Sequence, residues 1–160
     1  KCGTLLVERF LENEGMIPYC EHCGQYRFPM FNTAVSMVVY SPDHSKILLI
    51  QQYGKARNIL VAGYVNKGES AEEAVVREVK EETGLTVLDY RFNKSEYFAK
   101  SNTLMVNFAC TVDSENFTLR KGEVDRAGWF SVEEARAQIY HDSLAEKFLL
   151  SAIEKRLYQA

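Results

Sequence analysis

Residues Gly63–Leu85 read GYVNKGESAEEAVVREVKEETGL, and this stretch predicts one short helix with an unusual set of charges. Ser70 and Glu73 form a capping-box pattern, in which each side chain can accept a hydrogen bond from an amide of the first turn. Gly84 can take the left-handed conformation that often follows a last helical turn. The helix is therefore expected to begin after Ser70 and to end before Gly84.

Charged residues stand where the apolar face of this helix should continue. At about 100° per residue, Ala71, Ala74 and Val75 share one face. The same face is expected to carry the carboxylates of Glu78, Glu81 and Glu82. Carboxylates turned toward an interior repel one another and are poorly solvated, so they require a positive partner. Mg²⁺ and Mn²⁺, which bind oxygen ligands, are the cations that this pattern favours.

The alternative is a solvated acidic helix, which is the usual meaning of a run of charges. Glu72, Glu73 and Lys80 already occupy the opposite face, so the sequence favours the cation site. Arg77 lies four residues before Glu81, a spacing at which a guanidinium can hold a carboxylate in place.

The same stretch resembles the Nudix family. Gly63, Glu69 and the run Arg77–Leu85, separated by five and seven residues, match every fixed position of the Nudix box. The box covers 23 of the 160 residues. The resemblance implies a metal-dependent hydrolase that acts on nucleoside diphosphates linked to another moiety.

The composition indicates one substantial core. The 160 residues are 46% hydrophobic, and 19 basic against 22 acidic residues give a formal charge of −3. That charge does not support a surface that wraps nucleic acid. No apolar run is long enough to predict a membrane span, and nothing at the first residues resembles a signal peptide. The four cysteines do not suggest a disulfide scaffold, which favours a reducing cytoplasm.

Residues 1–31 are expected to form a small module ahead of a domain at residues 32–160. They hold three of the four cysteines and few long apolar runs. Strands are expected at Thr4–Phe10 and Ile17–Tyr19, which suits a ribbon hairpin.

The cysteines of this module predict a zinc site. Cys20 and Cys23 have the C-x2-C-G form of a zinc knuckle, and Cys2, followed by glycine, resembles half of another. A four-thiolate site then needs one more cysteine before residue 1, because Cys110 lies deep in a later strand and His22 is expected to point the wrong way if both flanking cysteines bind. The sequence predicts a truncated zinc-ribbon-like module with one structural Zn²⁺. Free thiols in an empty ribbon are the alternative.

Residues 32–160 are expected to alternate strands and helices. A hairpin is predicted at Thr33–Tyr40 and Lys46–Tyr53. Further strands are expected at Ile59–Val65, Thr86–Tyr90, Thr103–Val112, Asn116–Leu119 and Glu123–Phe130. One helix is expected to follow Ser131, and a last helix is expected at Asp142–Leu157. These elements predict an α/β fold, a Nudix-type α/β/α sandwich with a mixed sheet between helical layers.

The zinc-ribbon-like module followed by the box resembles the NADH pyrophosphatase branch of the Nudix family. The similarity extends to GEVDRAGWF at residues 122–130, so it covers nearly the whole chain. It implies cleavage of NADH or NAD to nicotinamide mononucleotide and AMP, with NAD-capped RNA as the one nucleic-acid substrate. It also implies a homodimer.

The branch resemblance implies roles for individual residues. The ligands of Mg²⁺ or Mn²⁺ would be the carboxylates of Glu78, Glu81, Glu82 and Glu123 and the carbonyl of Ala62. Glu81 is alternatively an acid–base group, and Arg77 would orient the ligands. On sequence alone, Glu123 could equally be a surface residue. Tyr64 takes the place of an aromatic residue that stacks on the nicotinamide.

The segment Ser95–Ser101 departs from the branch. The branch carries Ser-Gln-Pro-Trp-Pro-Phe-Pro here, whereas this chain reads SEYFAKS. Without prolines, the loop is expected to be more flexible or differently shaped. Its expected substrate contacts are Glu96, Tyr97, Phe98, Lys100 and Ser101.

This departure keeps a second substrate open, namely ADP-ribose or another nucleoside diphosphate derivative. A distant alternative is a non-catalytic nucleotide sensor or a ribbon-based nucleic-acid adaptor. The intact box and the mixed charges of residues 1–31 disfavour that alternative.

Overall fold

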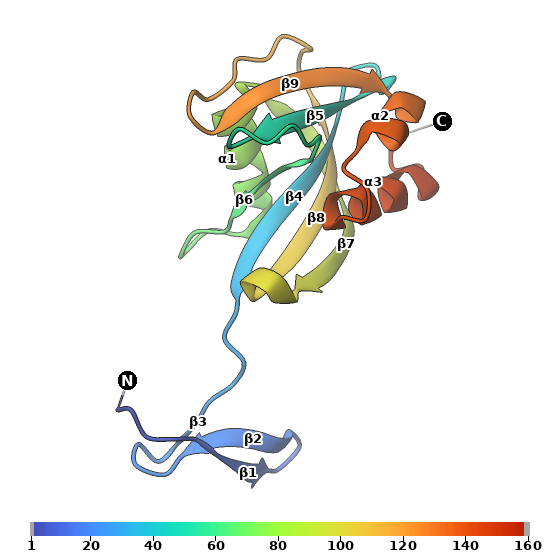
Figure 1. The fold of residues 1–160 in the computed structure, drawn as a ribbon. Coiled ribbons are helices and arrows are strands. Elements are labelled where there is room, and N and C mark those ends of the chain that lie inside the picture. Colours follow the sequence, from blue (N-terminus) through green and yellow to red (C-terminus); the bar gives the residue numbers. More distant parts are fainter. Residues whose placement is uncertain (1, 159–160) are drawn as a thin grey trace. The chain divides into compact units, whose positions relative to one another are not determined.

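The computed structural model describes residues 2–158 and divides into two units, Lys1–Phe31 and Asn32–Ala160. Each unit has its own β-sheet, of three strands in the first and six in the second (Figure 1).

The first unit is a three-stranded antiparallel sheet. Its strands are β1 (Val7–Leu11), β2 (Gly15–Cys20) and β3 (Gln25–Tyr26), so the first strand begins later than predicted and the second is longer. Among its described residues, Cys20 alone is buried. Domains of this size that lack an apolar core are usually stabilised by a metal ion or by disulfides.

The second unit is built on a mixed sheet with strand order β7-β8-β4-β5-β9, and β6 pairs with β4. The strands are β4 (Asn32–Tyr40), β5 (Lys46–Gln52), β6 (Val61–Tyr64), β7 (Val87–Phe98), β8 (Thr103–Val112) and β9 (Val124–Ser131). β4 and β8 run parallel, and the other paired strands run antiparallel. The predicted hairpin of β4 and β5 is confirmed.

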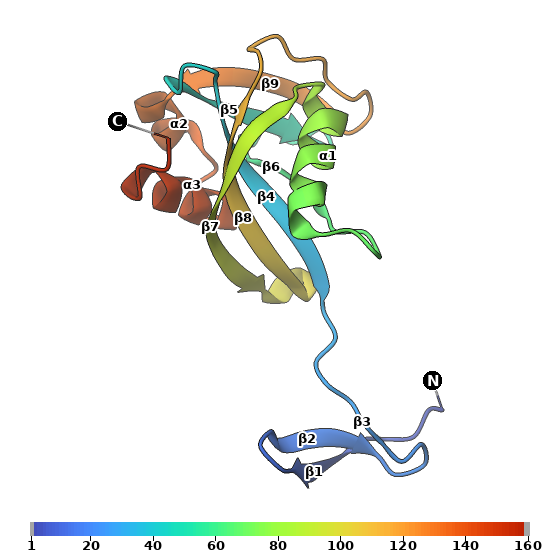
Figure 2. The ribbon, with the colours of Figure 1, turned by 180° about the vertical axis from the view of Figure 1, so that it is seen from behind.

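Helices cover both faces of this sheet. They are α1 (Ala71–Thr83), α2 (Val132–Gln138) and α3 (Leu144–Glu154). Figures 1 and 2 show α1 on one face, with α2 and α3 on the other. Strand β4 explains this arrangement, because Val35 and Met37 join the core under α1 whereas Val38 and Tyr40 join the core under α3. The predicted α/β/α sandwich is confirmed.

The prediction for β7 is wrong in its length. The strand was expected to end at Tyr90, but it continues to Phe98 and is followed by a 3-10 turn, η1 (Ala99–Ser101). Its second half is polar, so it lacks the apolar pattern from which a strand is predicted. The apolar strand β8 pairs with it as far as Phe98 and Thr103, and polar side chains are accepted because β7 is an edge strand.

Two further predictions need correction. No strand forms at Asn116–Leu119, where the Thr118 amide donates instead to the Thr83 carbonyl at the end of α1. The last helix is shorter than the predicted Asp142–Leu157, because it begins after the Ser143 cap and ends at Glu154. None of the described helices is long and apolar enough to cross a membrane.

Candidate active site

Side chains and backbone fix both ends of α1, as predicted. The Ser70 hydroxyl accepts a hydrogen bond from the Glu73 amide at 3.2 Å, and the Glu73 carboxylate accepts one from the Ser70 amide at 2.8 Å. Gly84 has a φ of 72°, and its amide donates to the Lys80 carbonyl at 2.9 Å. A residue with a Cβ would be strained in this left-handed conformation. The capping-box prediction is therefore confirmed.

Two of the three predicted inward carboxylates face the sheet. Glu82 is 3% exposed, and the side chain of Glu78 is 12% exposed. The side chain of Glu81 is 42% exposed, so the prediction that it shares the inward face is wrong. One residue corresponds to a rotation of about 100° around the helix, and this rotation brings Glu81 to the solvent.

Glu82 is a buried acid with one unpaired oxygen. Its Oε1 accepts a hydrogen bond from the Gln52 amide at 2.9 Å, whereas its Oε2 has no hydrogen-bond partner within residues 2–158. Burial, reinforced by the charges of Glu78 and Glu123, raises the pKa of Glu82 to about 8. A buried carboxylate of this kind is unfavourable as an anion, so the site suits a cation.

Gly63 explains why the box begins with a glycine. A Cβ added to this residue of β6 would lie 2.0–2.4 Å from the carboxyl atoms of Glu78, which leaves no space for any side chain. The Glu78 carboxyl group therefore packs directly against the strand backbone, next in sequence to Ala62.

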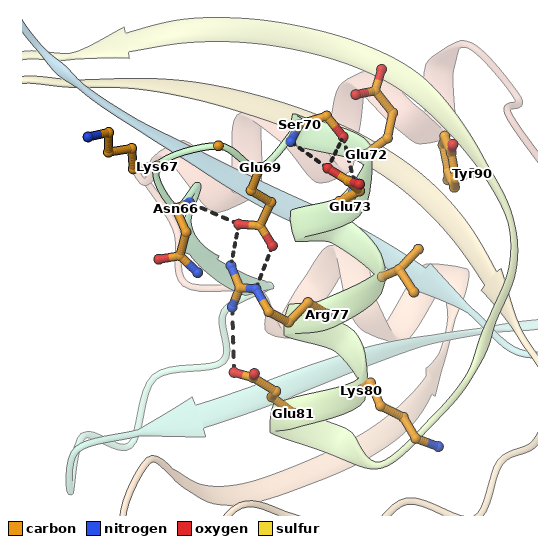
Figure 3. A pocket seen from close by; sticks show the side chains of 12 residues that line it. Asn66, Lys67, Glu69, Ser70, Glu72, Glu73, Arg77, Lys80, Glu81 and Tyr90 are labelled. Carbon is orange, nitrogen blue, oxygen red and sulfur yellow. Dashed lines mark hydrogen bonds and ion pairs between the residues drawn. The ribbon is translucent and has the colours of Figure 1, made fainter.

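Arg77 contacts three carboxylates, and Figure 3 shows its contacts with two of them, Glu69 and Glu81. Its guanidinium donates to the two oxygens of Glu69 at 2.6 and 2.8 Å and to Glu78 at 2.6 Å. It also donates to the Tyr64 carbonyl at 3.0 Å and contacts Glu81 at 3.5 Å. The bonds from Arg77 hold the pKa of Glu69 at about 2. The arginine thus positions the carboxylates, and Glu69 anchors the arginine.

The loop between β8 and β9 carries Glu123 to the same site. The Arg120 amide of this loop donates to the Glu82 carbonyl at 3.2 Å. The Arg120 side chain lies 3.1 Å from a Glu81 oxygen and 3.0 Å from Oε2 of Glu123. That second contact is an ion pair without a hydrogen bond, and the Glu123 oxygen is buried.

The sequence interpretation missed two residues of this site, Gln52 and Arg120. A signal for Gln52 existed, because Leu48 and Ile50 of β5 face α1 and the strand period continues that face to Gln52. An amide there interrupts an apolar face. No periodic signal marks Arg120, which lies in an irregular loop.

A cavity of about 320 Å³ lies beside β6, on the side of α3. It is lined by Ala34, Ala62, Gly63, Tyr64, Phe98, Ser101, Thr103, Met105 and Leu144. Tyr64, Phe98 and Ser101, which the sequence assigns to substrate binding, therefore lie around one cavity. Its mostly apolar wall and two aromatic rings suit a planar ring.

The segment Ser95–Ser101 is not the loop that was predicted. Its first four residues belong to β7, and η1 follows them. Since side chains alternate along a strand, Tyr97 and Phe98 point to opposite faces. Tyr97 lies outside the lining of the 320 Å³ cavity, and its hydroxyl donates to Asn102 at 2.7 Å.

Two charged residues of this segment also lie outside the cavity lining. Glu96 forms ion pairs with Lys147 at 2.7 Å and with Lys94 at 3.7 Å, so its charge is already compensated. Lys100 is exposed on η1.

A larger groove of about 960 Å³ runs along the outer side of α1 (Figure 3). The loop before α1, the helix itself and Tyr90 line it. It includes Arg77 and Glu81 but neither Glu78 nor Glu82. Size alone therefore does not identify the site, because the buried carboxylates face the sheet.

The first unit brings three cysteines together. The Cys2 sulfur lies 3.5 Å from that of Cys20 and 3.4 Å from that of Cys23. A ring nitrogen of His22 lies within 4.8 Å of the sulfurs of Cys2 and Cys23, but this group does not include Cys20. The expectation that His22 is misplaced for a site formed by both flanking cysteines is therefore not contradicted. Tetrahedral zinc with bonds of ~2.3 Å places sulfurs about 3.8 Å apart, which this spacing approaches. Cys110 is buried in β8, as expected.

The fold and the site define a class of protein, a mixed-sheet sandwich whose acidic helix packs buried carboxylates against a glycine-containing strand. The family profile of the NUDIX domain matches residues 30–150. This match spans well over half of the chain, so the chain belongs to the Nudix family.

Two curated relatives are similar in sequence. The "NAD-capped RNA hydrolase NudC" of Mycobacterium tuberculosis is 37% identical over 118 residues, which cover 72% of this chain and 38% of that protein. The protein of the same name from Haemophilus influenzae is 30% identical over 159 residues, which cover 96% of this chain and 59% of that protein. The chain thus spans less than two thirds of either relative.

A solved structure shares the fold. The NUDIX hydrolase from Nitrosomonas europaea superimposes with a TM-score of 0.71 at 18% identity, covering 99% of this chain and 92% of that chain. At this identity the likeness concerns the fold alone.

Proposed function

We propose that this chain hydrolyses a diphosphate bond in a nucleoside diphosphate linked to a second moiety, with Mg²⁺ or Mn²⁺ as the cofactor. The observation that carries this proposal is the buried carboxylate of Glu82, which has one oxygen without a hydrogen-bond partner within residues 2–158. Two further glutamates lie close enough to raise its pKa. A cation beside these groups would stabilise their charged forms.

The cation would be held by Glu78, Glu82 and Glu123, with the Ala62 carbonyl as a further ligand. All four donors are oxygen atoms, which hard divalent cations prefer. Such a cation neutralises a diphosphate and lowers the pKa of a bound water. Glu81 is exposed, which suits a further ligand or a group that exchanges a proton with solvent.

Two residues would position these carboxylates before substrate binds. Arg77 holds Glu78 at 2.6 Å, and Gln52 holds one oxygen of Glu82 at 2.9 Å. Each bond fixes one oxygen and leaves the other for a ligand. Hydrogen bonds of this kind hold each carboxylate in one rotamer, so that its oxygens are already positioned to bind the cation.

NADH or NAD is the substrate that we favour, with nicotinamide mononucleotide and AMP as products. Tyr64 and Phe98 line the 320 Å³ cavity and would contact a nicotinamide or adenine ring. The two curated relatives are named as NAD-capped RNA hydrolases, which supports a substrate built on NAD. NAD-capped RNA presents the same diphosphate.

ADP-ribose is a second candidate. The hydroxyls of Ser101 and Thr103 lie 2.9 Å apart in the wall of the same cavity. They would suit the hydroxyl groups of a terminal ribose that carries no nicotinamide.

A hydrolysis assay with Mg²⁺ or Mn²⁺ tests these proposals on NADH, NAD, ADP-ribose and a dinucleoside polyphosphate. We expect NADH or NAD to give the highest kcat/KM and to yield the two mononucleotides. A higher kcat/KM for ADP-ribose than for NADH and NAD would mean that ADP-ribose is the preferred substrate. If none of these compounds is cleaved with either cation, the proposed activity is wrong.

We also propose that Cys2, Cys20 and Cys23 bind one structural Zn²⁺. The small buried core of the first unit and the sulfur spacing support this proposal. Zinc analysis of the purified protein tests this site, and less than about 0.3 zinc per chain would contradict it.

A homodimer in the cytoplasm is proposed from the family resemblance. Light scattering at several protein concentrations tests the oligomeric state.

A further inference from the structure

A second cavity, of about 210 Å³, opens at the end of β5, and we call it the Tyr53 pocket. It is lined by Gln52, Tyr53, Lys55, Arg57, Ile59 and Tyr140. Gln52 connects it to the candidate active site, because the same side chain donates a hydrogen bond to Glu82 at 2.9 Å. The pocket is therefore one residue away from the buried carboxylates.

The loop that forms this pocket is tied to the strand that follows Glu123. The Gly54 amide donates to the Asp125 carboxylate at 2.6 Å, and Asp125 lies two residues after Glu123. Tyr53 has a φ of 54°, a left-handed conformation that bulky residues rarely adopt. The residue is 65% exposed. The backbone is thus held in a strained form that presents an aromatic ring to the solvent.

Two cations accompany this ring. The guanidinium of Arg57 stacks on the Tyr140 ring at 4.6 Å. Within residues 2–158, neither Arg57 nor Lys55 forms an ion pair with a carboxylate. Aromatic and guanidinium planes stack on nucleobases, and unpaired cations bind phosphates.

We propose that the Tyr53 pocket binds the nucleotide that extends the substrate beyond the reacting diphosphate, as in the 5′ segment of a single-stranded RNA. This inference rests on the proposed function. Tyr53 stacks on the base, and Lys55 and Arg57 bind the phosphate that follows it. A volume of about 210 Å³ is below the roughly 300–1,000 Å³ of sites that enclose a whole ligand, so one base fits with its phosphate outside.

The first test measures binding without hydrolysis. A fluorescent single-stranded RNA of about five nucleotides with a 5′-monophosphate is titrated with the full chain in EDTA, and anisotropy is recorded. We expect saturable binding that weakens as salt increases, because phosphate contacts release counterions. Free AMP should compete at least about tenfold less well than the RNA. Equal affinity for AMP, or no binding of the RNA, would overturn the proposal.

Three variants locate the contact. Tyr53→Ala and Arg57→Ala should each weaken RNA binding by about fivefold or more, the scale of one lost stacking or charged contact. Lys55→Ala keeps the test independent of folding, because within residues 2–158 its side chain forms no hydrogen bond or ion pair that supports the loop. This variant should also reduce the salt dependence of RNA binding. Arg136→Ala is the matched control, because this exposed arginine of α2 lies outside the pocket lining. Equal binding by all four variants would place the RNA elsewhere.

A kinetic arm separates this inference from the proposed function. We expect the pocket variants to raise the KM for NAD-capped RNA relative to the KM for NAD by about fivefold, while Arg136→Ala leaves that ratio unchanged. An unchanged ratio in the pocket variants, with both substrates cleaved, contradicts the inference alone. If neither substrate is cleaved, the proposed function fails, and the anisotropy measurements still decide whether the pocket binds RNA.

Discussion

The guanidinium of Arg120 lies 3.0 Å from the Glu123 carboxylate, inside the cluster that is proposed to bind a divalent cation. The same guanidinium lies 3.1 Å from Glu81. Arg120 thus supplies positive charge to this cluster, and a divalent cation would compete with it for Glu123.

Arg120→Gln should therefore tighten the binding of Mn²⁺. Removing one positive charge a few ångströms away from a half-exposed carboxylate is worth about 1 kcal/mol, or about fivefold in Kd at low salt. Free Mn²⁺ measured by electron paramagnetic resonance gives the Kd directly. Lys121→Gln, which removes the neighbouring exposed charge, is the control. Equal Kd values for wild type and Arg120→Gln would show that the ion pair does not compete with the metal.

Glu82→Gln should lower kcat by at least about 100-fold, the scale of losing a positioned base or ligand. The amide keeps the shape of the side chain, so circular dichroism should remain unchanged. Glu72→Gln, on the exposed face of the same helix, should retain wild-type kcat. If Glu82→Gln kept more than about a tenth of the wild-type activity, Glu82 would not belong to the active site.

The stability of the metal-free protein should depend on the protonation of Glu82. Its pKa rises from 4.5 to about 8, chiefly through burial, so the folded state binds this proton more tightly than the unfolded chain. The resulting stabilisation is fully present below about pH 4.5 and is lost as the pH rises through about 8. Over this window the free energy of unfolding should fall by roughly 4 kcal/mol from this group.

Urea denaturation in EDTA at several pH values measures this effect. Glu82→Gln carries no titrating group at this position, so its free energy of unfolding should fall less than that of wild type between pH 5 and pH 8, by roughly 4 kcal/mol. Parallel curves for wild type and Glu82→Gln would contradict the raised pKa.

Gly63→Ala should destabilise the protein, because the new methyl group would occupy the position of the Glu78 carboxyl group. Overpacking of this kind costs about 1–3 kcal/mol, measured as a change in the urea midpoint. The double variant Gly63→Ala/Glu78→Ala is the internal control. It should recover most of the stability while remaining inactive, and a double variant as unstable as Gly63→Ala would mean that the strand itself requires glycine.

The sequence predicted the parts of the fold that local chemistry determines. The ends of α1 follow from Ser70 and Gly84, and the two-sided apolar pattern of β4 predicts a strand between two helical layers. The second half of β7 was missed because an edge strand needs no apolar face of its own. Its partner β8 supplies the pairing, and no pattern within β7 records that.

The site was predictable where it lies on one helix and not where separate segments meet. Helical spacing correctly placed Glu78 and Glu82 on the inward face. Glu81 precedes Glu82 by one residue, so it lies about 100° around the helix and is exposed. The contacts of Gln52 with Glu82 and of Arg120 with Glu81 join positions 30 or more residues apart, so only the folded chain reveals them.

Strand β6 separates the two halves of the proposed chemistry. Gly63 lies against the carboxyl group of Glu78 on the side of α1, whereas Ala62 and Tyr64 line the cavity on the side of α3. Within residues 2–158, β6 pairs with β4 alone, so its other edge is free of strand pairing. A substrate of the proposed kind would pass around this edge in a bent shape, and the width of β6 would then set the distance between its ring and its phosphorus.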